Sequence, residues 1–291
     1  PVACGPEEAG DVTLVGSCGT KAKGRPVMMR LPWLCDVLAS VGVLAMIVAT
    51  SGIVWSDEQS AATLLKRASQ EASNGQSAEA VRLATAAIDA GSVDASVYYL
   101  RGREHFRLGQ IKPSIADFDR YIQLRPASRA RLWERGISCY YGGQFEEGAK
   151  QFAEYQTYHG NDVENAVWHV LCNSKVIGFQ AATRQLLPIQ LDRRVPMMKI
   201  YDLFRGQAQP EEVLKQANDD PPSEEQLNRR LFYAHLYLGL YYEARGDTGK
   251  AQAHITAAAE QHRLDGYMWD VARVHAERLK RNRADRPASS E

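Results

Sequence analysis

The chain has 291 residues, of which 45% are hydrophobic and 24% charged, and its 35 lysines and arginines balance 35 aspartates and glutamates. This composition is that of an ordinary globular protein, and it carries no surplus of positive charge that would hold nucleic acid. Five cysteines, with no CxxC spacing, are too few for a disulfide framework and do not form a zinc motif.

The first 27 residues mix Gly, Pro and charged residues without periodicity. We expect residues 1–27 to be disordered or to lie upstream of the true start, because Met28-Met29-Arg30 is a better start. Residues 28–56 are then a signal peptide or a membrane anchor. Within them, residues 37–55 contain no charge over 19 positions, which is near the length needed to span a bilayer.

Both of these interpretations export the rest of the chain. Cleavage near Ser56 leaves a soluble protein outside the cytoplasmic membrane, whereas an uncleaved segment leaves a single-pass anchor with its domain on the periplasmic side. The signal peptide is the preferred interpretation, and a buried core helix is the third. Positive side chains before the segment keep that end in the cytoplasm, namely Lys21, Lys23, Arg25 and Arg30.

A repeat with a period of 34 residues follows. Gly75, Gly109 and Gly143 are each 34 residues apart. The same interval joins further pairs, namely Gly102 and Gly136, Phe118 and Phe152, Tyr121 and Tyr155, and Ile111 and Phe145. A unit of this length with a Gly near its middle is typical of the tetratricopeptide repeat (TPR), two antiparallel helices joined by a tight turn. We therefore predict an all-α, TPR-type helical repeat solenoid.

The predicted TPR domain covers residues 57–282. Its predicted units are regular repeats at 61–94, 95–128 and 129–162, a degenerate helical middle at 163–231, a further repeat at 232–265 and a capping helix at about 267–281. The later repeat is placed by Gly239 and Gly246, which keep the seven-residue separation of Gly102 from Gly109. Residues 283–291 are predicted to be a disordered tail.

No motif in the sequence supports catalysis. We find no nucleophile elbow, phosphate loop or paired catalytic carboxylates in a supporting context, and we predict no enzymatic activity and no cofactor. His254 and His262 are eight residues apart, but no third ligand is apparent, so we predict no metal site. Cys139 and Cys172 occupy similar places in successive first helices, and we expect buried free thiols, with a disulfide as the alternative.

The predicted binding surface is the concave groove formed by the first helix of each repeat. In this register the groove positions are Tyr99, Arg103, Phe106, Trp133, Ile137, Tyr140 and Tyr141. Aromatic and Arg side chains bury large contact areas in interfaces, so we expect a protein segment with apolar side chains, extended or helical. Two alternatives stay open. In the first, the groove is filled by the terminal helix or by a second subunit. In the second, these side chains pack inside the superhelix.

Residues 135–143, RGISCYYGG, resemble the bacterial envelope lipoprotein NlpI family and its TPR relatives, which carry a similar RGxxxYYGG stretch. The likeness covers about residues 60–280. It includes Asn161-Asp162 followed by Trp168, residues 201–206 before 210–214, and residues 232–239 leading into Gly246-Asp247. The resemblance implies an all-helical periplasmic scaffold, often a homodimer, that brings peptidoglycan hydrolases and a processing protease together. One departure is the absence of a lipobox cysteine after the apolar segment, since Cys35 lies near its beginning.

Together these features predict a non-catalytic adaptor or scaffold of the cell envelope. Its expected partners are peptide or helix segments of envelope enzymes, bound in the groove, and a membrane is contacted only through an uncleaved N-terminal segment. Nucleic acid is not an expected partner. The alternative is a self-assembling structural or oligomerisation protein whose groove is filled by itself.

Overall fold

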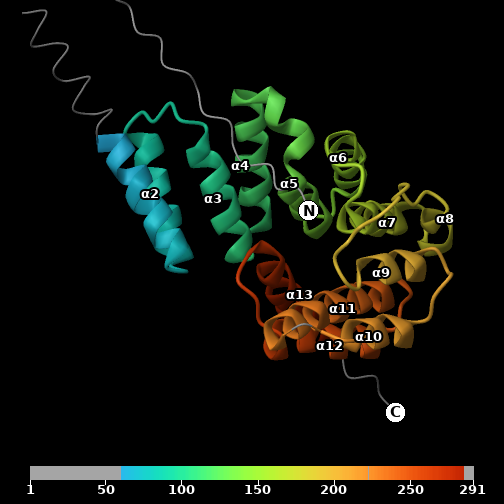
Figure 1. The fold of residues 1–291 in the computed structure, drawn as a ribbon. Helices are drawn as coiled ribbons and strands as arrows, with labels where there is room; N and C mark the ends of the chain where they lie inside the picture. Colours follow the sequence, from blue (N-terminus) through green and yellow to red (C-terminus); the bar gives the residue numbers. More distant parts are fainter. Residues whose placement is uncertain (1–59, 222, 285–291) are drawn as a thin grey trace, which may run out of the picture. The chain divides into compact units, whose positions relative to one another are not determined.

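The computed structural model describes residues 60–221 and 223–284 (Figure 1). The predictions for residues 1–56 and for most of the tail lie outside this part of the chain. The chain divides into two units, Pro1–Ser51 and Gly52–Glu291, and every described residue belongs to the second. Within the described ranges each regular element is a helix, which confirms the all-α class. None of these helices combines the length and the apolar character needed to cross a bilayer.

The helices follow one another with short connections. The first are a helix at 60–73, α2 (Ser77–Asp89), α3 (Ser96–Arg107), α4 (Ile111–Leu124), the 3-10 helix η1 (Pro126–Arg131), α5 (Trp133–Tyr141), α6 (Phe145–Tyr158) and α7 (Val163–Ile177). The rest are α8 (Phe179–Thr183), α9 (Met197–Phe204), α10 (Pro210–Asn218), α11 (Glu224–Ala244), α12 (Thr248–Thr256), the π-helical turn η2 (Ala257–Gln261) and α13 (Tyr267–Ala284). Because α2, α4 and α6 begin 34 residues apart, the period of the sequence is the spacing of successive helical hairpins.

Glycine shapes the hairpins α3–α4 and α5–α6 in two ways. Gly109 and Gly143 have φ angles of 70° and 75°, a region that a side chain rarely adopts, and they make the turn between the two helices. Inside the hairpin a second glycine permits close packing. A Cβ added at Gly136 would lie 2.7 Å from the ring of Phe152, 16 residues further along the chain. These contacts explain why the glycines recur with the repeat.

The second half of the domain departs from regular repeats. Asp162 caps α7, because its side chain accepts a hydrogen bond from the backbone N–H of Glu164. Ser223 caps α11 in the same way, so this helix begins eight residues before the predicted repeat at 232–265. At the end of the domain, α13 continues past Arg283, where the tail was predicted to begin.

The main hydrophobic core lies in this second half and in the neighbouring hairpin. It extends from Phe106 to Ala276 and is centred on the buried side chains of α7 and α11, such as Trp168 and Tyr237. The first helices have a much smaller core of their own, formed by Ala68, Leu83, Ala84, Ala87 and Val97. Hydrophobic stabilisation is therefore concentrated after residue 105.

Candidate protein-binding groove

The seven predicted groove side chains all lie on α3 and α5, the first helices of two successive hairpins. Their surroundings differ. Tyr99, Arg103 and Trp133 are partly exposed. Phe106, Ile137 and Tyr140 are almost completely buried, with exposed fractions of 0%, 0% and 1%. Tyr141 is intermediate. The surface available to a partner is therefore smaller than the sequence indicates.

The terminal helix α13 covers one part of the predicted groove. The ring of Phe106 stacks on Tyr267 with 5.1 Å between centroids. Tyr141 and Nδ1 of His275 share a hydrogen bond of 2.9 Å, and the guanidinium of Arg278 lies 5.7 Å from the Tyr141 ring. These contacts are intramolecular, so Phe106 and Tyr141 face the protein's own terminal helix.

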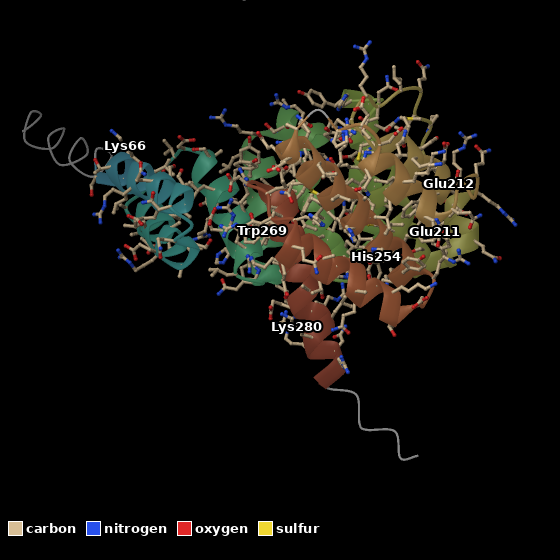
Figure 2. All side chains as sticks on the ribbon, turned by 60° about the horizontal axis from the view of Figure 1, so that its bottom comes forward. Lys66, Glu211, Glu212, His254, Trp269 and Lys280 are labelled. Carbon is tan, nitrogen blue, oxygen red and sulfur yellow. The ribbon has the colours of Figure 1, made fainter. Side chains whose placement is uncertain are left out.

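Polar contacts hold α13 in this place. Asp270, which is 6% exposed, accepts a hydrogen bond of 2.7 Å from Nε of Arg107 at the end of α3. Arg273 donates to the backbone carbonyl of Arg107. Figure 2 shows Trp269 near the start of α13 and Lys280 near its end. A buried carboxylate paired with Arg needs this partner, so the start of α13 is held against α3.

The rest of the groove is a row of three hollows. The first, of about 360 Å³, lies between the helix at 60–73 and α3 and is lined by Tyr99 and Arg103. The second, of about 330 Å³, is also lined by Tyr99, and by Trp133 and Tyr158. The third, of about 250 Å³, lies where α5, α6 and α7 meet α11 and α13, and shares Trp133 and Tyr155 with the second. Because neighbouring hollows share lining residues, they lie next to one another, and together they are called the open groove below.

The ring of Tyr99 is held rigidly in the open groove. Its hydroxyl donates a hydrogen bond of 2.6 Å to Glu134, a carboxylate that is 5% exposed. Burial raises the pKa of both groups, and the nearby Glu134 charge raises that of Tyr99 further. The guanidinium of Arg103 lies 5.7 Å from the centre of the Tyr99 ring. Tyr99 therefore remains a protonated donor to Glu134 and presents a fixed aromatic surface.

A charged network forms one side of the third hollow. Arg194 donates to Asp192 at 2.6 Å, to Asp162 at 2.7 Å and to Glu164 at 2.5 Å. Burial acts to lower the pKa of Arg194, but the three carboxylates raise it overall. Glu164 also accepts a hydrogen bond from Tyr237, and burial raises the pKa of Glu164 to about 7. The hollow thus contains a carboxyl group whose burial favours its neutral form, while its pairing with Arg194 favours the charged form.

Sequence reasoning placed only Trp133 and Ile137 in the groove and missed the other residues of the third hollow, among them Asn165, Trp168 and Arg194. Arg194 belongs to the loop before α9, whose position no repeat predicts. Asn165 gave no clear signal, because it follows Glu164 and precedes the apolar residues of α7, and its burial, at 3% exposed, is seen only in the structure.

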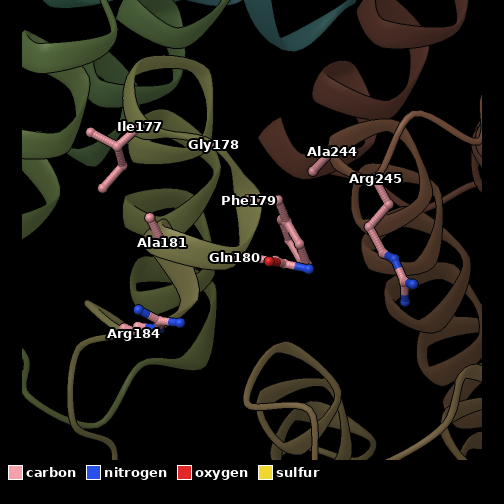
Figure 3. Close-up of a pocket in the computed structure, with 8 residues that line it drawn as sticks. All are labelled: Ile177, Gly178, Phe179, Gln180, Ala181, Arg184, Ala244 and Arg245. Atoms are coloured by element: carbon pink, nitrogen blue, oxygen red, sulfur yellow. The ribbon is translucent and has the colours of Figure 1, made fainter.

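A separate hollow of about 620 Å³ lies between the α7–α8 connection and the end of α11 (Figure 3). Phe179 and Gln180 approach it from one side and Arg245 from the other. Of the buried polar atoms that lack a partner in the described residues, none belongs to a side chain that lines this hollow. It offers a ligand less specific chemistry than the open groove does.

The histidines and cysteines lie away from any reactive arrangement. His235 lies beside His254 and His262, the two histidines considered above as metal ligands. Its Nδ1 is 3.0 Å from Nδ1 of His254, and its ring stacks on the ring of His262. Among residues 60–221 and 223–284, no group of three or more His, Cys, Asp or Glu side chains is arranged to hold a metal ion. Cys139 and Cys172 are buried free thiols. Burial raises the pKa of Cys139 to about 11, which suppresses the thiolate.

No family model matches the chain. Among solved structures it is similar to the C-terminal part of a TPR repeat-containing protein from Cytophaga hutchinsonii, with a TM-score of 0.37 and 18% identity over 68% of this chain and 67% of that chain. It is also similar to a thermophilic TPR protein from Thermus thermophilus, with a TM-score of 0.39 and 15% identity over 76% of this chain and 98% of that chain. Because both scores are below 0.5, the fold assignment rests on the helix spacing and packing described above.

Proposed function

We propose that the protein is a non-catalytic adaptor that binds segments of other proteins in the open groove. The observation that carries this proposal is the group of aromatic side chains that line the second hollow, Tyr99, Trp133, Tyr155 and Tyr158. Tyr158 is 59% exposed although it is large and partly apolar. Trp and Tyr dominate the binding energy of many interfaces because they bury large areas with few rotatable bonds.

We extend the proposal to the cell envelope, with peptidoglycan hydrolases or a protease as the partners. Two features of the sequence support this extension, the uncharged run at 37–55 and the resemblance to the NlpI family. Export predicts a defined N-terminus. The intact mass of the protein from producing cells should place it at Asp57 or Gly52 after cleavage, or at Met28 in the membrane fraction for an anchor. A chain that starts at Met28 and stays in the cytoplasm would contradict export.

The adaptor proposal is tested by crosslinked affinity capture from envelope extracts. Trp133→Leu combined with Tyr158→Ala removes two rings of the open groove. Tyr99 is left in place because its loss would strand the buried Glu134, and Tyr140 because it lies in the core. Val93→Ser is the matched control, since Val93 is 86% exposed and lines none of the three hollows.

The native chain and the control should recover the same cell-wall hydrolases or protease. The groove variant should lose them while its helical circular dichroism is unchanged. An unaltered set of partners in the groove variant would exclude this groove as the binding surface.

A self-assembling structural protein is the second candidate function. It is favoured by the cover that α13 places on Phe106 and Tyr141, since this cover reduces the surface left for a partner. Sedimentation of the full chain separates the two. An oligomer that persists on dilution and that the groove variant dissociates would favour self-assembly, whereas a monomer would favour the adaptor.

A further inference from the structure

Three histidine side chains meet where α12 and η2 pack against α11. His235 belongs to α11, His254 to α12 (Figure 2), and His262 follows η2 directly. The Nδ1 atoms of His235 and His254 are 3.0 Å apart, and the ring of His262 stacks on that of His235 with 5.3 Å between centroids. All three side chains are partly exposed, so protons reach them from solvent. The three residues are called the histidine cluster below.

The contact between His235 and His254 limits how many protons the cluster can hold. A hydrogen bond between two imidazole nitrogens needs one N–H and one lone pair. The bond therefore forms only when one of the two Nδ1 atoms carries no proton. One charged ring and one neutral ring satisfy this condition, but two charged rings do not. A second proton on this pair replaces the hydrogen bond by two opposed N–H groups and a repulsion between like charges.

His262 brings a third charge close to the same contact. Its Nδ1 lies 3.0 Å from Oδ1 of Asn228, so it donates to this oxygen in both the neutral and the charged form of the ring. Protonation of His262 therefore keeps the ring in place against His235, where its charge repels a charge on His235. Each proton that the cluster binds makes the next one less favourable.

Other charges near the cluster do not offset this repulsion. Among the described residues, the pKa values of the three histidines respond to one another and to Lys250, which lies one turn before His254 and disfavours a charge there. The charged groups of α7 and α9, which also pack on α11, do not act on these pKa values. The remaining neighbours act elsewhere, namely Asp247 on Lys250, Glu211 of α10 on Tyr242, and Glu260 of η2 on Lys280 of α13.

The folded cluster therefore resists protonation. Burial, together with the neighbouring His254 and His262, lowers the pKa of His235 to about 4. Burial also lowers the pKa values of His254 and His262. In a segment that has opened to solvent, a histidine has a pKa of about 6.5. The opened form binds more protons than the folded form, so its population rises as the pH falls below 6.5.

The segment on one side of the cluster is held less firmly than the other. The buried residues of α12 are Ala251 and Ile255, and those of η2 are alanines, whereas α11 lies in the main core. Little apolar surface therefore holds α12 and η2 in place. At the end of this segment the carbonyl of Ala259 accepts a hydrogen bond of 3.0 Å from Nε1 of Trp269. Movement of η2 therefore reaches the start of α13, the helix that covers part of the predicted groove.

We propose that the histidine cluster is an acid-sensitive contact that holds α12 and η2 on α11 at neutral pH and releases them below about pH 6. Protonation of more than one member breaks the hydrogen bond between α11 and α12 and sets like charges against each other. The start of α13 loosens with the segment through Trp269. This device is independent of the partner that the open groove binds.

Hydrogen exchange of the full chain at pH 7 and pH 5, corrected for the intrinsic effect of pH on exchange, measures the release. The amides of residues 248–261 and the indole N–H of Trp269 should lose protection at least tenfold at pH 5. The size follows from linkage, because one histidine whose pKa rises from about 4 to about 6.5 on opening favours the open form about 20-fold over this interval.

Variants assign the effect to the cluster. His235→Gln combined with His254→Gln keeps polar side chains at the contact and should remove most of the pH dependence at residues 248–261. His159→Gln is the matched control, because His159 is exposed and follows α6, and it should behave as the native chain. His275→Gln should also retain the loss of protection at residues 248–261, which separates the cluster from the buried histidine of α13.

The proposal is overturned if the native chain and the double variant lose protection equally at pH 5, or if the native chain loses none. If the double variant fails to fold, titration of the His235 ring resonance in the native chain takes its place. A pKa near 4 supports the proposal. A pKa near 6.5 would overturn it, because protonation would then cost the folded contact nothing.

Discussion

The burial of His275 predicts how stability depends on pH. This side chain is 0% exposed, and burial lowers its pKa to about 4. In the unfolded chain a histidine has a pKa of about 6.5, so as the pH falls the unfolded state takes up the proton first. The contribution of His275 to the free energy of unfolding is therefore fully present above pH 6.5 and is lost as the pH falls toward 4. Between pH 6.5 and 5 the loss from this one group is about 1.5 kcal/mol.

A variant that lacks His275 isolates the effect of this side chain on the pH dependence of stability. Burial raises the pKa of Glu164 to about 7, and a carboxyl with a raised pKa acts in the opposite direction. Burial also lowers the pKa of His235 to about 4, so the pH curve of the native chain alone mixes several groups. Urea unfolding of the native chain and of His275→Gln at pH 6.5 and 5 should show a smaller loss in the variant. Equal losses would show that His275 does not titrate as its burial indicates.

The close approach at Gly136 predicts a second residue-scale effect. A Cβ there would lie 2.7 Å from the Phe152 ring, and the ring is held between packed helices. Gly136→Ala should therefore lower the free energy of unfolding by about 1–3 kcal/mol. Gly249→Ala is the control, because the nearest atom to an added Cβ is 3.8 Å away and α12 should gain from alanine. Denaturant unfolding of both variants measures the difference, and equal stability would contradict this account.

At the scale of elements, the sequence predicts the hairpins well. The turns depend on glycines with positive φ, and the close helix packing depends on a second glycine, so both are encoded within a single repeat. These local requirements are visible as the 34-residue period. The predicted all-helical class is confirmed for the same reason.

The position of α13 could not be predicted in this way. The contacts of Phe106 with Tyr267 and of Arg107 with Asp270 join residues about 160 positions apart, and no periodicity connects them. Three of the predicted groove residues, Tyr99, Arg103 and Trp133, line the open groove with partly exposed side chains. Ile137 and Tyr140 lie in the core, and the terminal helix covers Phe106 and Tyr141. The third hollow also depends on how distant helices meet.

Removal of α13 tests its role as a packed element. Truncation after Gly266 exposes Phe106, removes its stacking partner and leaves Arg107 without Asp270. We expect the melting temperature to fall by more than about 10 °C and the binding of a hydrophobic dye to rise. Truncation after Ala284 is the control and should leave both unchanged. If both truncations melt together, the contacts of α13 contribute little.

At the scale of the whole molecule, the division of the core predicts uneven stability. The helix at 60–73 and α2 share only a small apolar cluster, whereas α7 and α11 lie in the main core. In a repeat array each unit is stabilised by its own core and by its neighbours, so the first helices have the least support. Amide hydrogen exchange should be at least tenfold faster at residues 60–89 than in α7 and α11. Equal protection would show that the whole array unfolds as one unit.

The return of α13 to α3 also has a consequence for the order in which the chain is made. Synthesis proceeds at about 5–20 residues per second, so on the order of ten seconds passes between the appearance of α5 and that of α13. During this interval the aromatic rings of α3 and α5 that α13 covers in the finished protein are unprotected. We therefore expect holding chaperones to bind the nascent chain until its last helix emerges and packs onto helices made much earlier.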